Sequence, residues 1–131
     1  MFPPEPLPQH PYSIDKAIAR IEGWYVAGDE ANRPQRNNNP GDLDYAPWQR
    51  AHGATLEVNP YIHPRFACFP TPADGWNALR ALLSGSLYSE MCVRDAVNRY
   101  APPSENNTVD YVAMVCDLCD CEPVALVKDL L

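Results

Sequence analysis

The sequence predicts an α+β fold in which helices dominate and a small antiparallel sheet follows the first helix. Three observations support this prediction. Apolar residues recur at steps of three and four between Ser13 and Gly28, segments after Thr71 repeat that spacing, and short segments between them are bounded by Gly and Pro. The length of 131 residues fits one domain, and the hydrophobic content of 46% is enough to form a core.

The first helix is expected to begin with Ser13 as its N-cap and to stop at Gly28. Its apolar face holds Ile14, Ala17, Ile18, Ile21 and Tyr25. Residues 1–12 precede it and contain five prolines. Because each proline fixes φ and removes an N–H donor, we expect this segment to form an extended, Pro-rich arm outside the core.

The sheet is expected from three short segments that Gly53 and several prolines separate, namely residues 43–46, 54–59 and 66–69. Thr71 then supplies an N-cap and is followed by Pro72, which favours the first helical turn, so a helix is predicted to run to Gly85. The same helical spacing predicts two further helices, over residues 89–100 and about 107–119. A last turn or two is predicted over residues 124–131.

The charge and hydropathy of the chain exclude several partners. The net charge is -7 and no cluster of Lys or Arg is present to hold phosphates, so nucleic acid is not expected as a partner. No apolar run reaches about 18 residues, so neither a membrane span nor a membrane partner is expected. The N-terminus lacks the basic and apolar regions of a secretory signal, so we expect synthesis in the cytoplasm. The oligomeric state is left open by the sequence.

The five cysteines form an odd and unevenly spaced set, which we interpret as reduced. Cys116, Cys119 and Cys121 lie close in sequence, but structural zinc takes four ligands from two separated pairs, and a second pair is missing. Cys116 and Cys119 also fit the apolar face of a helix, where cysteine acts as a small hydrophobic residue. We therefore expect no metal, and the sequence contains no Gly-rich phosphate loop that would indicate a cofactor.

Glu22 is the first candidate for chemistry. It borders the apolar face of the first helix, and a carboxyl held against apolar surface tends to have a raised pKa, as a general acid requires. The alternative is an ordinary solvated acid at the edge of that face. Its own helix offers no basic residue three or four positions away, which weakens this alternative.

Two further segments are candidates for binding. Asn37–Tyr45 supplies amide, carboxylate and hydroxyl groups that suit a sugar bearing N-acetyl groups, although Asn side chains that brace a turn would have the same pattern. Tyr100–Thr108 ends one predicted helix and starts the next, so Tyr100 is expected beside a bend where a cleft can open.

Four segments, taken in order, resemble one family. They are Ile18–Trp24, Asn38–Leu43, Phe66–Leu79 and Tyr100–Thr108. Over about residues 14–120 the chain resembles the lysozyme-like domains of phage, prophage and bacterial proteins that are related to lytic transglycosylases. The resemblance implies one lysozyme-like domain over residues 13–131, with a catalytic Glu at a cleft walled on one side by a small β lobe.

The resemblance also implies an activity, the cleavage of the MurNAc-GlcNAc glycan strand of peptidoglycan without a cofactor. Glu22 would be the single general acid and base, with the acetamido group of the substrate assisting at the anomeric carbon. By the same resemblance the Asn loop would lie along the glycan and Tyr100 near the acetamido group. The residues expected to bind substrate are Asn38, Asn39, Asp42, Asp44 and Tyr100.

The chain departs from this family at two positions. Asp42 stands where members usually have Asn, and Gly23 stands where Ser usually follows the catalytic Glu. Asp42 and Asp44 are therefore also candidates for the second carboxylate of an inverting hydrolase. The alternative function is an inactive lysozyme-like module that binds glycan or a protein partner, which the net charge of -7 favours. A wall enzyme without a signal would need a virion, a pore or a secretion system for its delivery.

Overall fold

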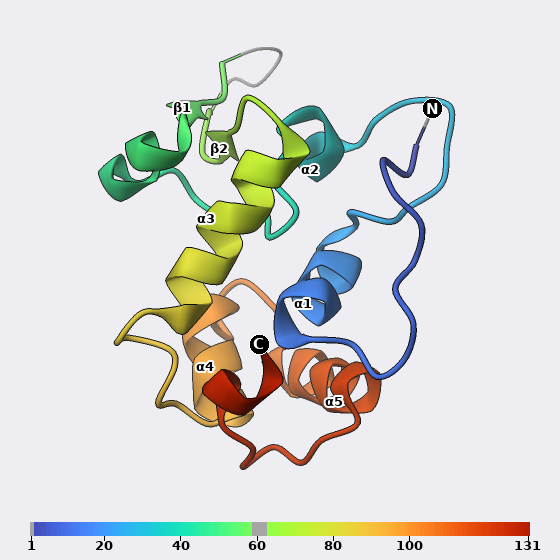
Figure 1. Cartoon of the computed structure of the whole chain (residues 1–131), viewed down its shortest axis with the longest axis vertical. Helices are drawn as coiled ribbons and strands as arrows, with labels where there is room; N and C mark the ends of the chain where they lie inside the picture. Colours follow the sequence, from blue (N-terminus) through green and yellow to red (C-terminus); the bar gives the residue numbers. More distant parts are fainter. Residues whose placement is uncertain (1, 59–62) are drawn as a thin grey trace. The chain divides into compact units, whose positions relative to one another are not determined.

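The chain is described by a computed structural model that covers residues 2–58 and 63–131. It is an α+β protein in which helices dominate and two short strands form an antiparallel sheet (Figure 1). The chain folds into two compact units. Unit 1 combines the residues up to Leu7 with Glu22–Leu79, and unit 2 combines Pro8–Ile21 with Arg80–Leu131. The predicted fold class is confirmed at this level.

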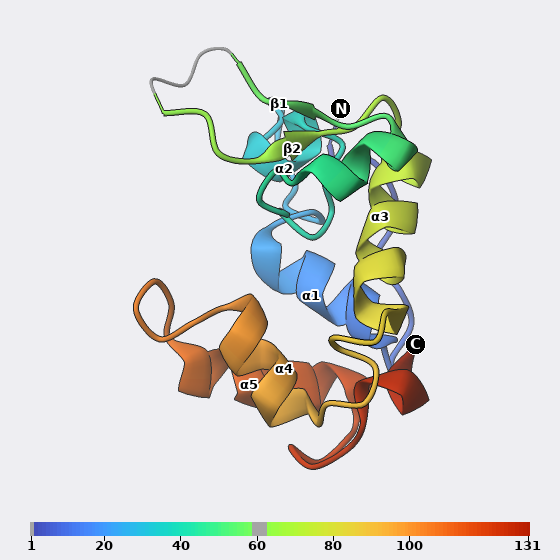
Figure 2. The same ribbon diagram turned by 90° about the vertical axis from the view of Figure 1, so that its left-hand side faces the viewer.

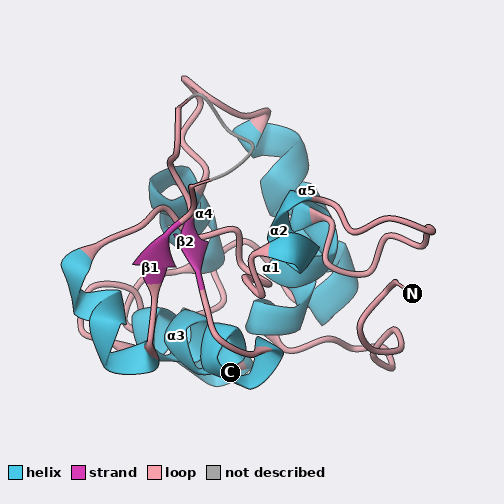
Figure 3. Ribbon diagram, turned by 90° about the horizontal axis from the view of Figure 1, so that it is seen from above, coloured by secondary structure: helices cyan, strands magenta, loops and turns pink. Residues whose placement is uncertain are grey.

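Unit 1 contains the sheet. Strand β1 (Thr55–Leu56) pairs with β2 (Ala67–Cys68), with Thr55 opposite Cys68 (Figure 3). A single bridge between Asp44 and Phe66 extends the pairing toward the loop before it. All three predicted segments therefore take part, but the strands are shorter than predicted, and Asn59 of the second segment lies outside the described residues.

Unit 1 also contains two short helices that the sequence did not predict. Helix α2 (Arg33–Arg36) begins with Asn32 as its N-cap, whose side chain accepts from the backbone N–H of Gln35 while the Gln35 side chain accepts from the N–H of Asn32. A 3₁₀ helix, η1 (Pro47–His52), ends at Gly53, where φ is +78°. Both lie within the stretch whose composition predicts loop or strand.

The helix α1 (Ile14–Glu22) ends six residues before Gly28, so the prediction that it continues to Gly28 is wrong. The reason is Gly23, whose φ of +101° takes the chain out of the helix. Few residues other than Gly adopt a φ of this value. Its carbonyl accepts from the side chain of Asn32 at 2.8 Å, which fixes the new direction of the chain. The buried face of α1 consists of Ile14, Asp15, Ala17, Ile18 and Ala19.

Residues 2–12 make specific contacts although they form no helix. Within unit 1, Phe2 forms a bridge with Gly28, and Oε1 of Glu5 accepts from the indole N–H groups of Trp24 and Trp76, each at 2.6 Å. The two indoles are buried and meet edge to face, with centroids 6.1 Å apart. The Pro-rich segment of unit 1 is thus held by two buried donors that share one carboxylate.

The remaining helices follow the predicted order. Helix α3 (Pro72–Ser84) agrees with its prediction, whereas α4 (Val93–Tyr100) begins four residues later than expected. Helix α5 (Thr108–Cys119) and the 3₁₀ helix η2 (Val127–Leu130) complete unit 2, in which α4 packs against α5 (Figure 2). Within the described ranges, no helix combines the length and the apolar character that crossing a membrane requires.

Candidate active site

Glu22 is the last residue of α1 and belongs to unit 1. It is half-buried, and the next two positions are fixed by the positive φ of Gly23 and by the fully buried Trp24. A side chain at Gly23 would be strained by this φ and would meet the amide nitrogen of Asn32 at 3.3 Å. Gly at position 23 is therefore required by the local backbone.

The loop that follows α2 is braced by Asn39. This residue is fully buried, its amide nitrogen donates to the carbonyls of Leu43 at 3.0 Å and Ala67 at 2.9 Å, and its side-chain oxygen accepts from the N–H of Leu43. Asn38 has a φ of +50°, and its amide donates to the carbonyl of Phe69 at 3.0 Å. The contacts of both side chains fasten the loop to the sheet, which is the structural role expected of Asn in turns.

Helix α3 supports the same loop by backbone contact. A Cβ atom added to Gly75 would lie 1.9 Å from the carbonyl oxygen of Asn38 and 2.8 Å from Cδ of Pro40. Only glycine fits at this position of α3. The close approach holds the segment between Asn38 and Asp42 at a fixed place within unit 1.

Asp42 is the most unusual residue of this loop. Its φ is +49°, its Oδ1 atom is buried, and this atom has no hydrogen-bond partner within the part of the chain that the structure describes. Burial, and next the negative charge of Glu22, raise the pKa of Asp42 from 3.8 to about 7. Arg33 opposes this rise, while Glu57 and Asp44 add to it. The Asp42 carboxyl therefore keeps its proton at pH values where an ordinary Asp is fully ionised.

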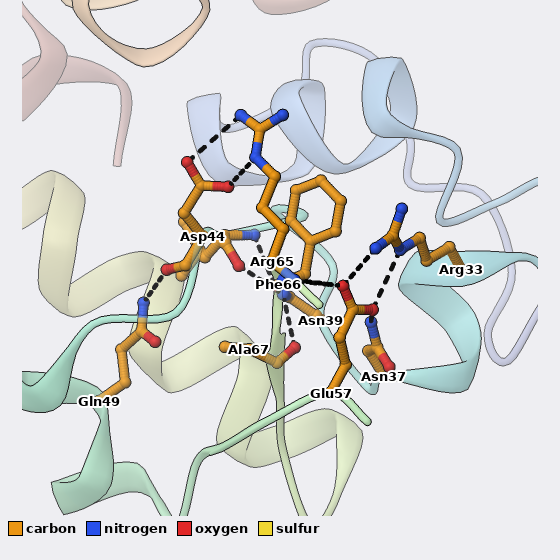
Figure 4. A network of polar contacts seen from close by, with 10 residues as sticks. Arg33, Asn37, Asn39, Asp44, Gln49, Glu57, Arg65, Phe66 and Ala67 are labelled. Atoms are coloured by element: carbon orange, nitrogen blue, oxygen red, sulfur yellow. Dashed lines mark hydrogen bonds and ion pairs between the residues drawn. The ribbon is translucent and has the colours of Figure 1, made fainter. Parts of the chain in front are cut away.

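Glu57 is a second buried carboxylate whose charge acts on Asp42. No sequence pattern indicated its role. It is 3% exposed, and its carboxylate accepts from Arg33, from the Asn37 amide at 2.9 Å and from the backbone N–H groups of Arg65 and Phe66 (Figure 4). Burial opposes the ionisation of Glu57, but the combined effect of these hydrogen bonds is larger and lowers its pKa to about 2. Glu57 therefore stays charged while Asp42 titrates.

Asp44 and Tyr100 have different surroundings from Asp42. Asp44 is exposed, forms an ion pair with Arg65 at 2.6 Å, and its backbone carbonyl accepts from Gln49, as Figure 4 shows. Tyr100 belongs to unit 2, where its ring meets that of Tyr88 edge to face with centroids 6.4 Å apart. Of the predicted site residues, the structure thus brings Glu22, Asn38, Asn39, Asp42 and Asp44 into one unit.

A cavity of about 560 Å³ opens beside the Asn loop, within the size range of ligand pockets. Its lining includes Asn37, Asn38, Glu57 and the exposed apolar residues Leu56 and Val58 of the β1 segment. Asn38 therefore combines a bracing hydrogen bond with a place on the wall of a cavity.

The cysteines are all free thiols, and residues 2–58 and 63–131 contain no group of three or more His, Cys, Asp or Glu side chains placed to hold a metal ion. Comparisons with protein-family models, with curated proteins and with solved structures found no match for this chain.

Proposed function

We propose that this protein cleaves the glycan strand of peptidoglycan, with Glu22 as the general acid and base. The observation that carries the proposal is the Asp42 carboxyl, whose Oδ1 atom is buried without a hydrogen-bond partner among the described residues and whose pKa is raised first by burial and next by the charge of Glu22. Two carboxyls in one site that share a proton are a recurring arrangement in acid–base catalysis. The resemblance of the sequence to lysozyme-like domains gives the substrate class and the expected lysozyme-like fold with its small β lobe.

The pair supplies the two protonation states that the reaction needs. Because Asp42 is partly buried and the charge of Glu22 repels a second negative charge, the pair retains one proton up to about pH 7, and its titration belongs to both residues together. In the first step this proton passes from Glu22 to the glycosidic oxygen, the bond between that oxygen and the anomeric carbon breaks, and the acetamido oxygen of the substrate attacks the carbon. In the second step the Glu22 carboxylate takes a proton from the hydroxyl of water or of the sugar itself, the oxygen of that hydroxyl bonds to the anomeric carbon, and the bond between this carbon and the acetamido oxygen breaks.

Asp42 sets the protonation state of Glu22 in this scheme. Its Oδ1 atom is buried and has no hydrogen-bond partner among the described residues, so its carboxyl gains little from ionising. Asp42 therefore keeps a proton beside Glu22 at pH values where an isolated carboxyl would have lost it. The Asn loop supports the scheme by fixing Asp42, and the cavity beside that loop is lined by Asn38 and Glu57, although not by Glu22 or Asp42. Tyr100 stays a candidate for binding the acetamido group.

The proposal is tested by incubating the purified protein with insoluble peptidoglycan and measuring soluble muropeptides by liquid chromatography and mass spectrometry. Glu22→Gln is expected to lose at least about 100-fold in rate, the typical contribution of a general acid. Glu30→Gln is the matched control, because Glu30 is exposed on the loop that follows and the change in charge is the same. Products lighter by one water than the hydrolysed fragments would identify anhydro-sugar formation.

Two outcomes would contradict the proposal. Equal release by the wild type and Glu22→Gln would remove Glu22 from the chemistry. Binding of the wild type to peptidoglycan without release of fragments would support the alternative, an inactive glycan-binding module, which the net charge of -7 favours.

A further inference from the structure

The C-terminal end of α5 has the backbone pattern of a Schellman motif. Asp120 follows the helix with φ +53° and ψ +54°, the N–H of Cys121 donates to the carbonyl of Cys116 at 3.0 Å, and the N–H of Asp120 donates to that of Asp117 at 3.4 Å. In this motif the side chains of the two residues joined by the outer hydrogen bond commonly make an apolar contact. Here both of these residues are cysteines.

The two side chains do meet. The Cys116 thiol donates a hydrogen bond to the Cys121 sulfur, and both residues are half-buried, so a small reagent can reach them. We propose that Cys116 and Cys121 form an intramolecular disulfide site that locks the end of α5. A disulfide requires Cα atoms about 4.4–6.8 Å apart and Cβ atoms about 3.5–4.5 Å apart. The backbone hydrogen bond between the same two residues already holds them at close range.

The third cysteine of the cluster is a poorer partner for either of them. Cys119 is 5% exposed and lies three residues after Cys116 on the same helix. Cβ atoms at this spacing are about 5–6 Å apart, which is too far for a disulfide without distortion of the helix. Cys119 and Cys121 are separated by a single residue, and Cys119 is directed into the core of unit 2. The geometry therefore selects the pair formed by Cys116 and Cys121.

The oxidant in this proposal is a low-molecular-weight disulfide such as oxidised glutathione. The Cys121 thiolate attacks one of its sulfurs and releases one glutathione thiolate; the Cys116 thiolate then attacks the Cys121 sulfur of the mixed disulfide and releases the second. Two protein thiols are oxidised, one external disulfide is reduced to two thiols, and the two thiol protons end on glutathione. No metal or cofactor takes part in this exchange.

The rate of this exchange should rise with pH. Burial, and next the neighbouring Cys121, raise the pKa of Cys116 to about 11, and burial raises the pKa of Cys121, whose thiolate is favoured by the hydrogen bond from Cys116. The other titratable groups that face the pair are Asp120, Glu122 and Cys119. All of these disfavour the thiolate when charged, so little thiolate is present at neutral pH.

The test treats the full chain with excess oxidised glutathione at about pH 8.5, the ordinary pKa of a free thiol, and alkylates the remaining thiols. Cleavage before Asp separates the three cysteines, because Asp110, Asp117 and Asp120 precede them one by one. We expect one cross-linked pair of peptides, 110–116 with 120–128, and a melting temperature about 5 °C higher than that of the reduced protein. Cys121→Ser should abolish both effects, whereas Cys119→Ala should retain the cross-link.

The peptide map of the wild-type protein decides the question even if a variant fails to fold. No cross-link under these conditions, or a cross-link that involves Cys119 in place of Cys116 or Cys121, would overturn the proposal. A cross-link between the expected peptides without any change in melting temperature would overturn the claim that the bond locks the helix end.

Discussion

Asp42→Asn is expected to stabilise the folded protein at pH 8 and to leave its stability at pH 4 nearly unchanged. The pKa of Asp42 is raised from 3.8 to about 7 on folding, first by burial and next by Glu22. A carboxyl with a raised pKa binds its proton more tightly in the folded state, so it favours folding below about pH 4, and this contribution is lost as the pH rises to about 7. Asn carries no charge at either pH and therefore avoids the loss.

The size of the effect follows from the same shift. At about 1.4 kcal/mol per pKa unit, the rise corresponds to about 4 kcal/mol. Because Asp42 is only partly buried and water screens part of the interaction, we expect a gain of about 2–3 kcal/mol in the free energy of unfolding at pH 8. Asn also tolerates the positive φ at this position, so the loop should keep its conformation.

Urea unfolding of the wild type and the variant at both pH values measures this gain. Asp44→Asn is the matched control, because Asp44 lies two residues away but is exposed and paired with Arg65. Its replacement should cost up to about 1 kcal/mol at pH 8, an effect of opposite sign. If Asp42→Asn were no more stable than the wild type at pH 8, or gained as much at pH 4, the inference that folding raises the pKa of Asp42 would be refuted.

Four further outcomes are expected. The alkaline limb of the pH–rate profile should move to lower pH in Asp42→Asn, because the proton that Asp42 holds up to about pH 7 is no longer present beside Glu22; an unchanged limb would show that Asp42 does not control the activity. Glu57→Gln should cost about 3 kcal/mol at pH 7, a loss that shrinks as the pH falls from about 4.5 to about 2 in urea titrations, because its pKa is lowered to about 2. Gly75→Ala should cost more than about 2 kcal/mol because the new methyl group meets a backbone carbonyl at 1.9 Å, and a neutral result in thermal unfolding would disprove the contact. Glu5→Ala should cost about 2–4 kcal/mol and shift the tryptophan fluorescence, since two buried indole N–H groups lose their acceptor, whereas Glu5→Gln should cost less.

The helix starts could be predicted where their signals are local. Thr71 accepts from the N–H of Asp74 at 3.2 Å and donates to its carboxylate at 2.8 Å, so the capping that starts α3 lies within four consecutive residues. The end of α1 could not be predicted in this way, because Tyr25 continues the apolar spacing beyond the helix. What ends α1 is the φ of Gly23, and the Asn32 side chain that fixes it lies nine residues further along the chain.

The sequence named some residues of the candidate site, but it could not predict the electrostatics of that site. Glu22 and Asp42 are both candidates on the sequence alone, yet their coupling depends on a loop that places them together after about 20 residues of intervening chain. Glu57 could not be found because it follows the two-residue strand β1 and the Arg33 side chain that pairs with it comes from α2. A buried charge paired over such a distance leaves no periodic pattern in the sequence.

The unfavourable features of unit 1 gather in one loop, and this supports a functional role independently of any resemblance. Two non-glycine residues with positive φ, Asn38 and Asp42, lie four positions apart. The second of them also carries a buried oxygen without a hydrogen-bond partner among the described residues, and its pKa is raised first by burial and next by the charge of Glu22. Each feature lowers stability, and the Asn39 hydrogen bonds and the close approach of Gly75 offset that loss by holding the loop in place. A sequence selected for stability alone would place Asn at position 42, so the presence of Asp42 agrees with the role proposed for it beside Glu22.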